Sequence, residues 1–233
     1  MRAAASRYRA DLDAAAARSL GEHGGELTFA RLARLEPEIA LGLARHLAAQ
    51  IGELHVGGVT VDDAVAESLG RHEGSLFIRV VDDIPLPRLH ALVQHRGPLE
   101  SAGLTRLDES RAVVLAAQPG YRGFEGLSGL FIGGVTAITP AVAAILATHR
   151  AGGLALNGIR QLAEDVARER VWHPLLALDR VETLTDRVAS ILATHTGVTL
   201  SLRGLRSVSP AALAKLHASA SIELPRRLTA ARR

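Results

Sequence analysis

The chain has 233 residues, of which 48% are hydrophobic, so it carries enough apolar material for a buried core, and this argues against wholesale disorder. It contains no cysteine, which excludes disulfides and thiolate metal sites, and its formal net charge of +3 is too balanced to indicate a nucleic-acid partner by itself. No stretch approaches the roughly 20 consecutive apolar residues that a membrane span needs. The N-terminal stretch interrupts its alanines with arginine and aspartate and so lacks the apolar core of a secretory signal. We therefore expect a soluble, cytoplasmic protein.

An internal repeat runs along nearly the whole chain, and its most regular feature is a residue that starts a helix. This residue recurs every 22–26 residues, with one longer interval of 31 residues. The helix-start positions, in chain order, are Asp13, Glu36, Asp62, Pro85, Asp108, Thr139, Ala163, Thr185 and Ser209. Most of them are Asp, Thr or Ser, whose side-chain oxygens can accept a hydrogen bond from the first free N–H groups of a helix. The pattern predicts a helix of about ten residues after each position.

A short strand is predicted in front of each helix start from the second one onward. The sequence there follows the pattern L-x-L-x-x-L-x-x-L, and its first two apolar residues alternate with period two, as in a strand with one buried face. The first apolar residues of these segments are Leu27, Leu54, Leu76, Leu99, Leu130, Leu154, Leu176 and Leu200. A half-copy at Ile222 and Leu224 closes the series.

The helical half of each repeat carries its own core pattern. Four residues after the helix start the chain has mostly alanine, and seven residues after it mostly leucine, so both lie on one face of the helix. Arg170 is the exception at the leucine position. Twelve residues after the start a glycine recurs and is predicted to end the helix; these glycines are Gly25, Gly74, Gly97, Gly120 and Gly197. No unit can bury its apolar edge alone, so the units must stack on one another.

The complete repeat, L-x-L-x-G-L-x-x-L-[ST]-x-x-[AV]-A-x-x-L-A-x-H, is clearest at residues 130–152, 176–197 and 200–221. It resembles leucine-rich repeats, and more narrowly the bacterial leucine-rich-repeat-like arrays, over about residues 12–228. The resemblance implies an α/β, right-handed solenoid with short parallel strands on the concave face and short helices on the convex face. The chain departs from the common pattern because Asn157 is its single asparagine, so the asparagine ladder of standard repeats is essentially absent.

The repeat also predicts how the chain is organised. We divide it into an N-terminal helical cap at residues 1–25, about eight repeats at 26–221, and a cap strand with a basic tail at 222–233. The long interval holds an insertion near residues 118–129. The basic tail could touch nucleic acid, but almost no aromatic residues accompany it, so we expect a solvated terminus.

Seven of the ten histidines stand in register, ten residues after a helix start. They are His23, His46, His72, His95, His149, His173 and His195, while Gln118 and Ser219 occupy the same position in the other two copies. A metal site would need ligand nitrogens roughly 3–4 Å apart, whereas stacked helices lie roughly 8–10 Å apart. We therefore interpret these histidines as helix-end residues that donate to unpaired carbonyls and complement the helix dipole, with a shared pH response as the alternative.

Solenoids usually bind partners through their sheet, so the strand positions that face away from the core are candidate contact sites. Two rows of such positions are expected, and Phe77, Arg79, Phe131 and Arg203 are their predicted partner-binding residues. The insertion adds Tyr121 and Phe124 as a second candidate contact site. The alternatives are an inert, solvated sheet and a degenerate repeat that partly buries both aromatics of the insertion.

Catalysis finds little support, since the sequence has no nucleophile elbow, no phosphate-binding loop and no His-Glu-x-x-His motif. We predict no catalytic residue, no cofactor and no metal ligand. The predicted function is that of a non-enzymatic scaffold that binds a protein partner of unknown identity through the concave sheet. The alternatives are the recognition arm of an enzyme whose catalytic part lies elsewhere, and a purely structural spacer. The sequence leaves the oligomeric state open.

Overall fold

The computed structural model describes most of the chain in eleven segments. These are residues 12–22, 27–29, 36–44, 53–57, 61–72, 75–79, 84–101, 103–119, 129–150, 152–169 and 173–229. The described helices are α1 (Ala14–Gly21), α2 (Pro37–Ala44), α3 (Asp63–Gly70), α4 (Leu86–Leu92), α5 (Glu109–Ala116), α6 (Pro140–Leu146), α7 (Glu164–Arg168), α8 (Asp186–Leu192), α9 (Pro210–Ala218) and α10 (Arg226–Thr229). The described strands are β1 (Leu27–Phe29), β2 (Glu53–Gly57), β3 (Ser75–Arg79), β4 (Leu99–Ser101), β5 (Gly129–Ile132), β6 (Gly153–Ala155), β7 (Leu175–Ala177), β8 (Thr199–Ser201) and β9 (Ile222–Glu223).

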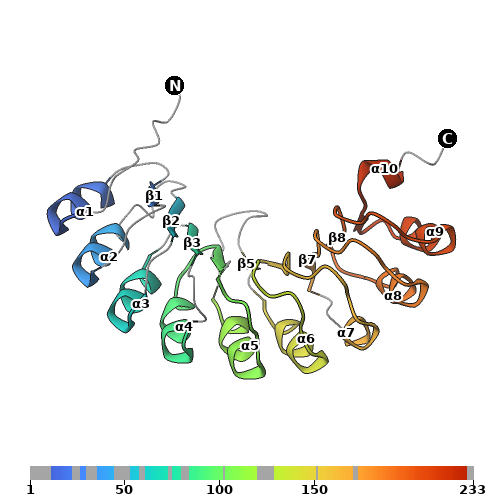
Figure 1. Ribbon diagram of the computed structural model, residues 1–233, viewed down its shortest axis with the longest axis horizontal. Helices are drawn as coiled ribbons and strands as arrows, with labels where there is room; N and C mark the ends of the chain where they lie inside the picture. Colours follow the sequence, from blue (N-terminus) through green and yellow to red (C-terminus); the bar gives the residue numbers. More distant parts are fainter. Residues whose placement is uncertain are drawn as a thin grey trace.

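The described strands form one sheet of nine, in the order in which they occur in the chain, and every neighbouring pair is parallel. Equivalent leucines of successive repeats are direct partners, as in the pairs Leu54–Leu76 and Leu154–Leu176. Figure 1 shows a curved array in which α1 to α9 follow the outer edge and the strands follow the inner edge. The predicted α/β class and the parallel strand arrangement are therefore confirmed, and the topology is compatible with an α/β solenoid.

The predicted helix starts are confirmed by the hydrogen bonds that cap them. The Asp62 carboxylate accepts from the N–H of Val65 at 2.9 Å, and the Thr185 hydroxyl accepts from the N–H of Val188 at 3.2 Å. The same bond is made by Asp13, Asp108, Thr139 and Ser209. Pro85 and Ala163 also precede a helix, but neither makes a side-chain capping bond, since neither side chain has an acceptor.

The helices end earlier than the sequence predicts, and the predicted terminating glycines that the structure describes, Gly97 and Gly197, lie beyond the ends of α4 and α8. Helices α1 to α9 have five to nine residues, and α8, for example, is followed by Ala193 in a right-handed conformation. Gly197 comes only four residues later, just before β8. A Cβ atom at Gly197 would lie 2.6 Å from the ring of His195, so glycine is needed there because the chain passes over a buried ring.

The core lies between the sheet and the helices, and it uses the residues that the repeat pattern predicts. The alanines at the fourth helix position and the leucines at the seventh are at most 3% exposed in most described repeats. They include Ala66, Leu69, Ala112, Leu115, Ala143, Leu146, Ala189 and Leu192. Side chains of this kind lose a large apolar surface to neighbouring repeats, which stabilises the stack because no repeat has a core of its own.

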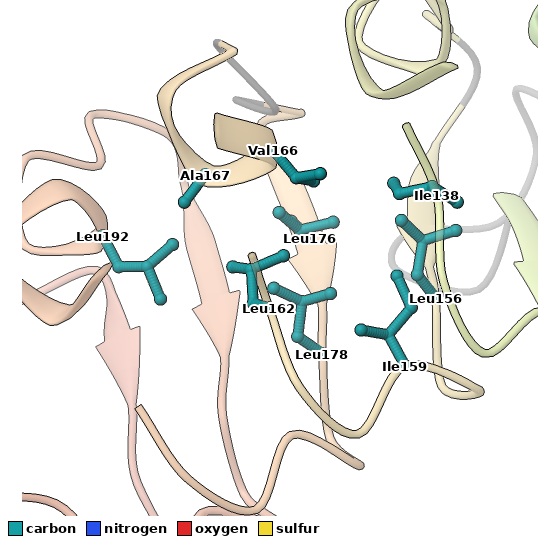
Figure 2. Close-up of a pocket in the computed structure, with 9 residues that line it drawn as sticks. All are labelled: Ile138, Leu156, Ile159, Leu162, Val166, Ala167, Leu176, Leu178 and Leu192. Atoms are coloured by element: carbon teal, nitrogen blue, oxygen red, sulfur yellow. The ribbon is translucent and has the colours of Figure 1, made fainter. Parts of the chain in front are cut away.

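One repeat packs less completely than the others. Helix α7 has five residues, and Arg170 stands in the sequence where the other repeats have leucine. An apolar cavity of about 10 Å³ lies beside this helix. Its lining comes from Ile138, Leu156, Ile159, Leu162, Val166, Ala167, Leu176, Leu178 and Leu192. Figure 2 shows Leu162, Leu176 and Leu178 between Leu192 on one side and Ile138 and Leu156 on the other. With an entirely apolar lining and room for about one water molecule, the cavity has no groups to hold that water.

Candidate interaction surface

Strand pairing aligns one residue from each described strand in a single row across the sheet. Strand pairing places Thr28, His55, Phe77, Glu100, Phe131, Ala155, Ala177, Ser201 and Glu223 directly beside one another. The predicted alignment is thus confirmed from Thr28 to Ser201, and Glu223 of β9 extends the row by one strand. Its expected exposure is only partly right: Glu100, Phe131 and Ala177 are half-buried, whereas Ala155 and Ser201 are 3% and 7% exposed. Ala155 is buried beside the larger Phe131, its partner in the sheet.

Two of the predicted partner-binding residues have described side chains. Phe131 lies in β5 between the buried Leu130 and Ile132, so its ring is held on the opposite face of the strand. Arg203 follows β8 with a side chain that is 67% exposed, and its Nη2 lies 2.7 Å from the Glu223 carboxylate. Phe131 and Arg203 are three strands apart, which is about 14 Å at the usual strand spacing.

The other four predicted contact residues are only partly covered by the structure. Phe77 and Arg79 lie in β3, where Phe77 pairs with Glu100 and with His55, so Phe77 shares the row of Phe131. The side chains of both residues lie outside the described part of the molecule. Tyr121 and Phe124, the aromatics of the predicted insertion, also lie outside the described residues.

A second row of polar residues follows the strands, and the structure gives part of it a structural role. The Asn157 side chain accepts from the backbone N–H of Asp179 at 3.1 Å, and the Asp179 carboxylate accepts from the backbone N–H of Arg203 at 3.0 Å. The Ser201 hydroxyl also donates to Asp179. The asparagine ladder that the sequence appeared to lack is therefore present as two consecutive hydrogen bonds. Asparagine is the acceptor in the first bond, and aspartate takes its place in the second. The signal is visible in the sequence as L-A-L-N and L-A-L-D at equivalent positions.

A scan of the sequence against protein-family models finds no match, and a search of curated proteins finds none. In the part of the chain that the structure describes, no helix is long and apolar enough to cross a membrane. The function must therefore be argued from the geometry of the surface itself.

A charged row that the sequence reasoning missed runs beside the sheet. Glu182 lies between two arginines of the neighbouring repeats, 3.7 Å from Arg160 and 3.6 Å from Arg206. These three residues stand at the same place, three residues before a helix start. An open recess of about 330 Å³ lies next to them, lined by Thr136, Arg160, Gln161, Glu182 and Thr183. The two guanidinium groups share one carboxylate, so these three residues together carry net positive charge. A surface with this charge suits contact with acidic groups.

The five described histidines of this register are buried, and each lies just beyond the end of a helix. His72, His95, His149, His173 and His195 are at most 5% exposed, and His23 and His46 lie outside the described residues. The rings of His72 and His95 stack with their centroids 5.4 Å apart. The expected separation of 8–10 Å was wrong because these residues follow the helix and lie near the sheet, where the spacing approaches that of strands.

These histidines bond mainly to the backbone of neighbouring repeats rather than to the carbonyls of their own helix. His95 Nδ1 lies 2.6 Å from the carbonyl oxygen of His72, one repeat earlier. Gln118, at the same position, donates from Nε2 to the carbonyl of Gly97 at 2.8 Å. Burial lowers the pKa of His195 below its ordinary value, which opposes the predicted interaction of a charged ring with the helix dipole. Among the described residues, no group of three or more His, Asp or Glu side chains is arranged to hold a metal ion.

Proposed function

We propose that this chain is a non-enzymatic protein-interaction scaffold of the bacterial leucine-rich-repeat-like type, which binds a protein partner through the concave face of its sheet. In this proposal the array is a right-handed solenoid, and it works in the cytoplasm, an assignment with which the absence of cysteine is consistent. The observation that carries the proposal is the in-register row along nine parallel strands, since such a row offers an extended contact surface of fixed spacing.

Three properties of the described surface support binding rather than chemistry. The half-buried ring of Phe131 is a rigid apolar anchor, and Arg203 offers an exposed guanidinium about 14 Å away across the strands. The Glu182 carboxylate beside the open recess is already shared by two arginines, so it is not placed as a free general base. The ladder through Asn157 and Asp179 holds the backbone beneath this surface in one shape.

The test combines a cross-linker with matched charge variants. A photo-reactive phenylalanine analogue at position 131 should form a covalent adduct with the partner in cells, while the same analogue at Val113 should not. Val113 is 56% exposed in helix α5, on the outer edge of the array, and so controls for exposure alone.

In the chain that carries the analogue at position 131, R203E should abolish the adduct, and in a pull-down without the analogue F131E and R203E should both lose the partner. Both variants should keep the far-UV CD spectrum and the melting temperature of the unaltered chain. The variant V113E should keep the partner. If F131E and R203E retain every partner that the unaltered chain captures, the concave face is not the binding surface.

A further inference from the structure

The buried histidines of the C-terminal repeats form a connected row. His149, His173 and His195 are 2%, 1% and 5% exposed, and each follows one of the helices α6 to α8. The rings of His149 and His173 stack with their centroids 5.5 Å apart. His195 Nε2 lies 3.4 Å from the carbonyl oxygen of His173, and the Ser221 hydroxyl donates to the carbonyl of His195 at 3.2 Å. The row therefore links four consecutive repeats through imidazoles and backbone carbonyls.

Protonation of His173 leaves a buried N–H group without an acceptor. Nδ1 of His173 lies 3.0 Å from the carbonyl oxygen of Leu175, the first residue of β7, to which it can donate, and 3.2 Å from the Leu175 backbone nitrogen. In the described part of the chain, Nε2 of His173 is buried and has no hydrogen-bond partner. A neutral ring that donates from Nδ1 has only a lone pair on Nε2, whereas a protonated ring carries an N–H group on both nitrogens. Protonation therefore adds an unpaired buried donor to a charged ring, which is costly.

The surroundings of the row also oppose positive charge. Burial is the main cause that lowers the pKa of His173, and the charge of the neighbouring His149 lowers it further, against the opposing effect of the backbone of Leu175 and His149. Burial likewise lowers the pKa of His195, against the opposing effect of the His173 carbonyl. In the described part of the chain, His173 faces the His149 ring and backbone groups, and no carboxylate is bonded to it.

We propose that this histidine row makes the packing between the C-terminal repeats sensitive to pH. Neutral rings hold β6 to β9 and their helices together, and protonation at mildly acidic pH opens the C-terminal part of the array. The inference does not depend on the proposed partner. Gln118 shows that the position itself does not require an ionisable group, since its amide makes the equivalent bond to the preceding repeat. It also separates the C-terminal row from the stacked pair of His72 and His95.

The direction of the pH effect follows from proton linkage. Below pH about 6.5 the unfolded chain binds protons that the buried rings exclude, so acid shifts the equilibrium toward the open or unfolded state. Each fully excluded histidine increases the unfolding equilibrium constant by up to about tenfold per pH unit, and His173 with His195 by up to about a hundredfold. The effect is absent above pH about 7.5, where both states bind no proton at these sites.

The experiment is urea unfolding of the full chain at pH values from about 8 to 5.5, which keeps most carboxylates ionised. The unaltered chain should lose stability below pH about 6.5. The variant H173Q should lower the pH dependence of the unfolding equilibrium constant by a factor of up to about ten per pH unit. The variant H90Q is the matched control, because His90 is an exposed histidine on α4, and its profile should match that of the unaltered chain. A flat profile for the unaltered chain, or superimposable profiles for it and H173Q, would overturn the proposal.

A second measurement does not depend on whether H173Q folds. In histidine-labelled protein, the NMR titration of the His173 ring should give a pKa below the ordinary histidine value of about 6.5. Amide exchange of Leu175, corrected for its intrinsic pH dependence, should accelerate as the pH falls below about 7. A His173 ring that titrates at or above about 6.5 would show that the folded repeats accept the proton, and the proposal would then be wrong.

Discussion

Replacing Asp179 tests the polar ladder that supports the candidate surface. In the variant D179A, the backbone N–H of Arg203 and the hydroxyl of Ser201 both lose their acceptor. A hydrogen bond to a charged group contributes about 1.5–3 kcal/mol, but Asp179 is only half-buried and water can replace part of each bond. We therefore expect D179A to lower the free energy of unfolding by about 2 kcal/mol, or about 30-fold in the equilibrium constant.

The variant D179N is the informative control, because the chain already uses asparagine at the equivalent place. The amide oxygen of Asn157 accepts the backbone N–H of Asp179, so an amide oxygen at position 179 can accept the N–H of Arg203 in the same way. We expect D179N to lose less than about 1 kcal/mol.

The assay is urea unfolding of the three proteins at neutral pH, together with amide exchange of Arg203 to locate the effect. Exchange should accelerate about 30-fold in D179A and only slightly in D179N, provided that exchange proceeds through opening of these repeats. If D179N is as unstable as D179A, or if D179A is within about 0.5 kcal/mol of the unaltered chain, the ladder does not hold the repeats together as argued.

Three further substitutions test the rest of the structure. T185A removes the cap that accepts the N–H of Val188 and should lower the free energy of unfolding by about 1 kcal/mol, while T185S should restore most of it. G197A places a methyl group 2.6 Å from the His195 ring and should destabilise the chain by about 1–3 kcal/mol, whereas an unchanged urea midpoint would mean that the ring moves away freely. L192A removes a side chain that is 3% exposed and already borders a cavity, so it should lose about 3–5 kcal/mol, measured by thermal and urea unfolding.

The parts of the fold that the sequence predicts are those decided by local chemistry. The cap residue Asp62 and its partner Val65 are three residues apart, so a helix start can be recognised without knowing what surrounds it. The period-two pattern around Leu76 likewise fixes which side of the strand is buried, and the repeat then places equivalent leucines side by side.

The parts that the sequence does not predict depend on how closely one repeat lies over the next. The burial of His173 and the role of Asp179 both come from backbone groups about one repeat away in the chain, whose distance is set by the spacing of the strands. The helix ends were misplaced for the same reason, since Gly197 is required by a ring beneath it and not by the helix before it. The sequence of one repeat does not determine these distances, because they depend on how the repeats stack.

Helix α7 gives the array an uneven stiffness. With five residues it presents less surface to its neighbours than the seven residues of α6 or α8, and the cavity beside it leaves part of that surface without contacts. In an array whose repeats contact only their neighbours, bending concentrates at the interface that has the least contact. In this array that interface, or joint, is the one at α7. Phe131 and Arg203 lie on opposite sides of this joint, and the bond between Asn157 and Asp179 crosses it on the strand side. We therefore expect the helices on either side of α7 to move relative to one another more easily than the strands do.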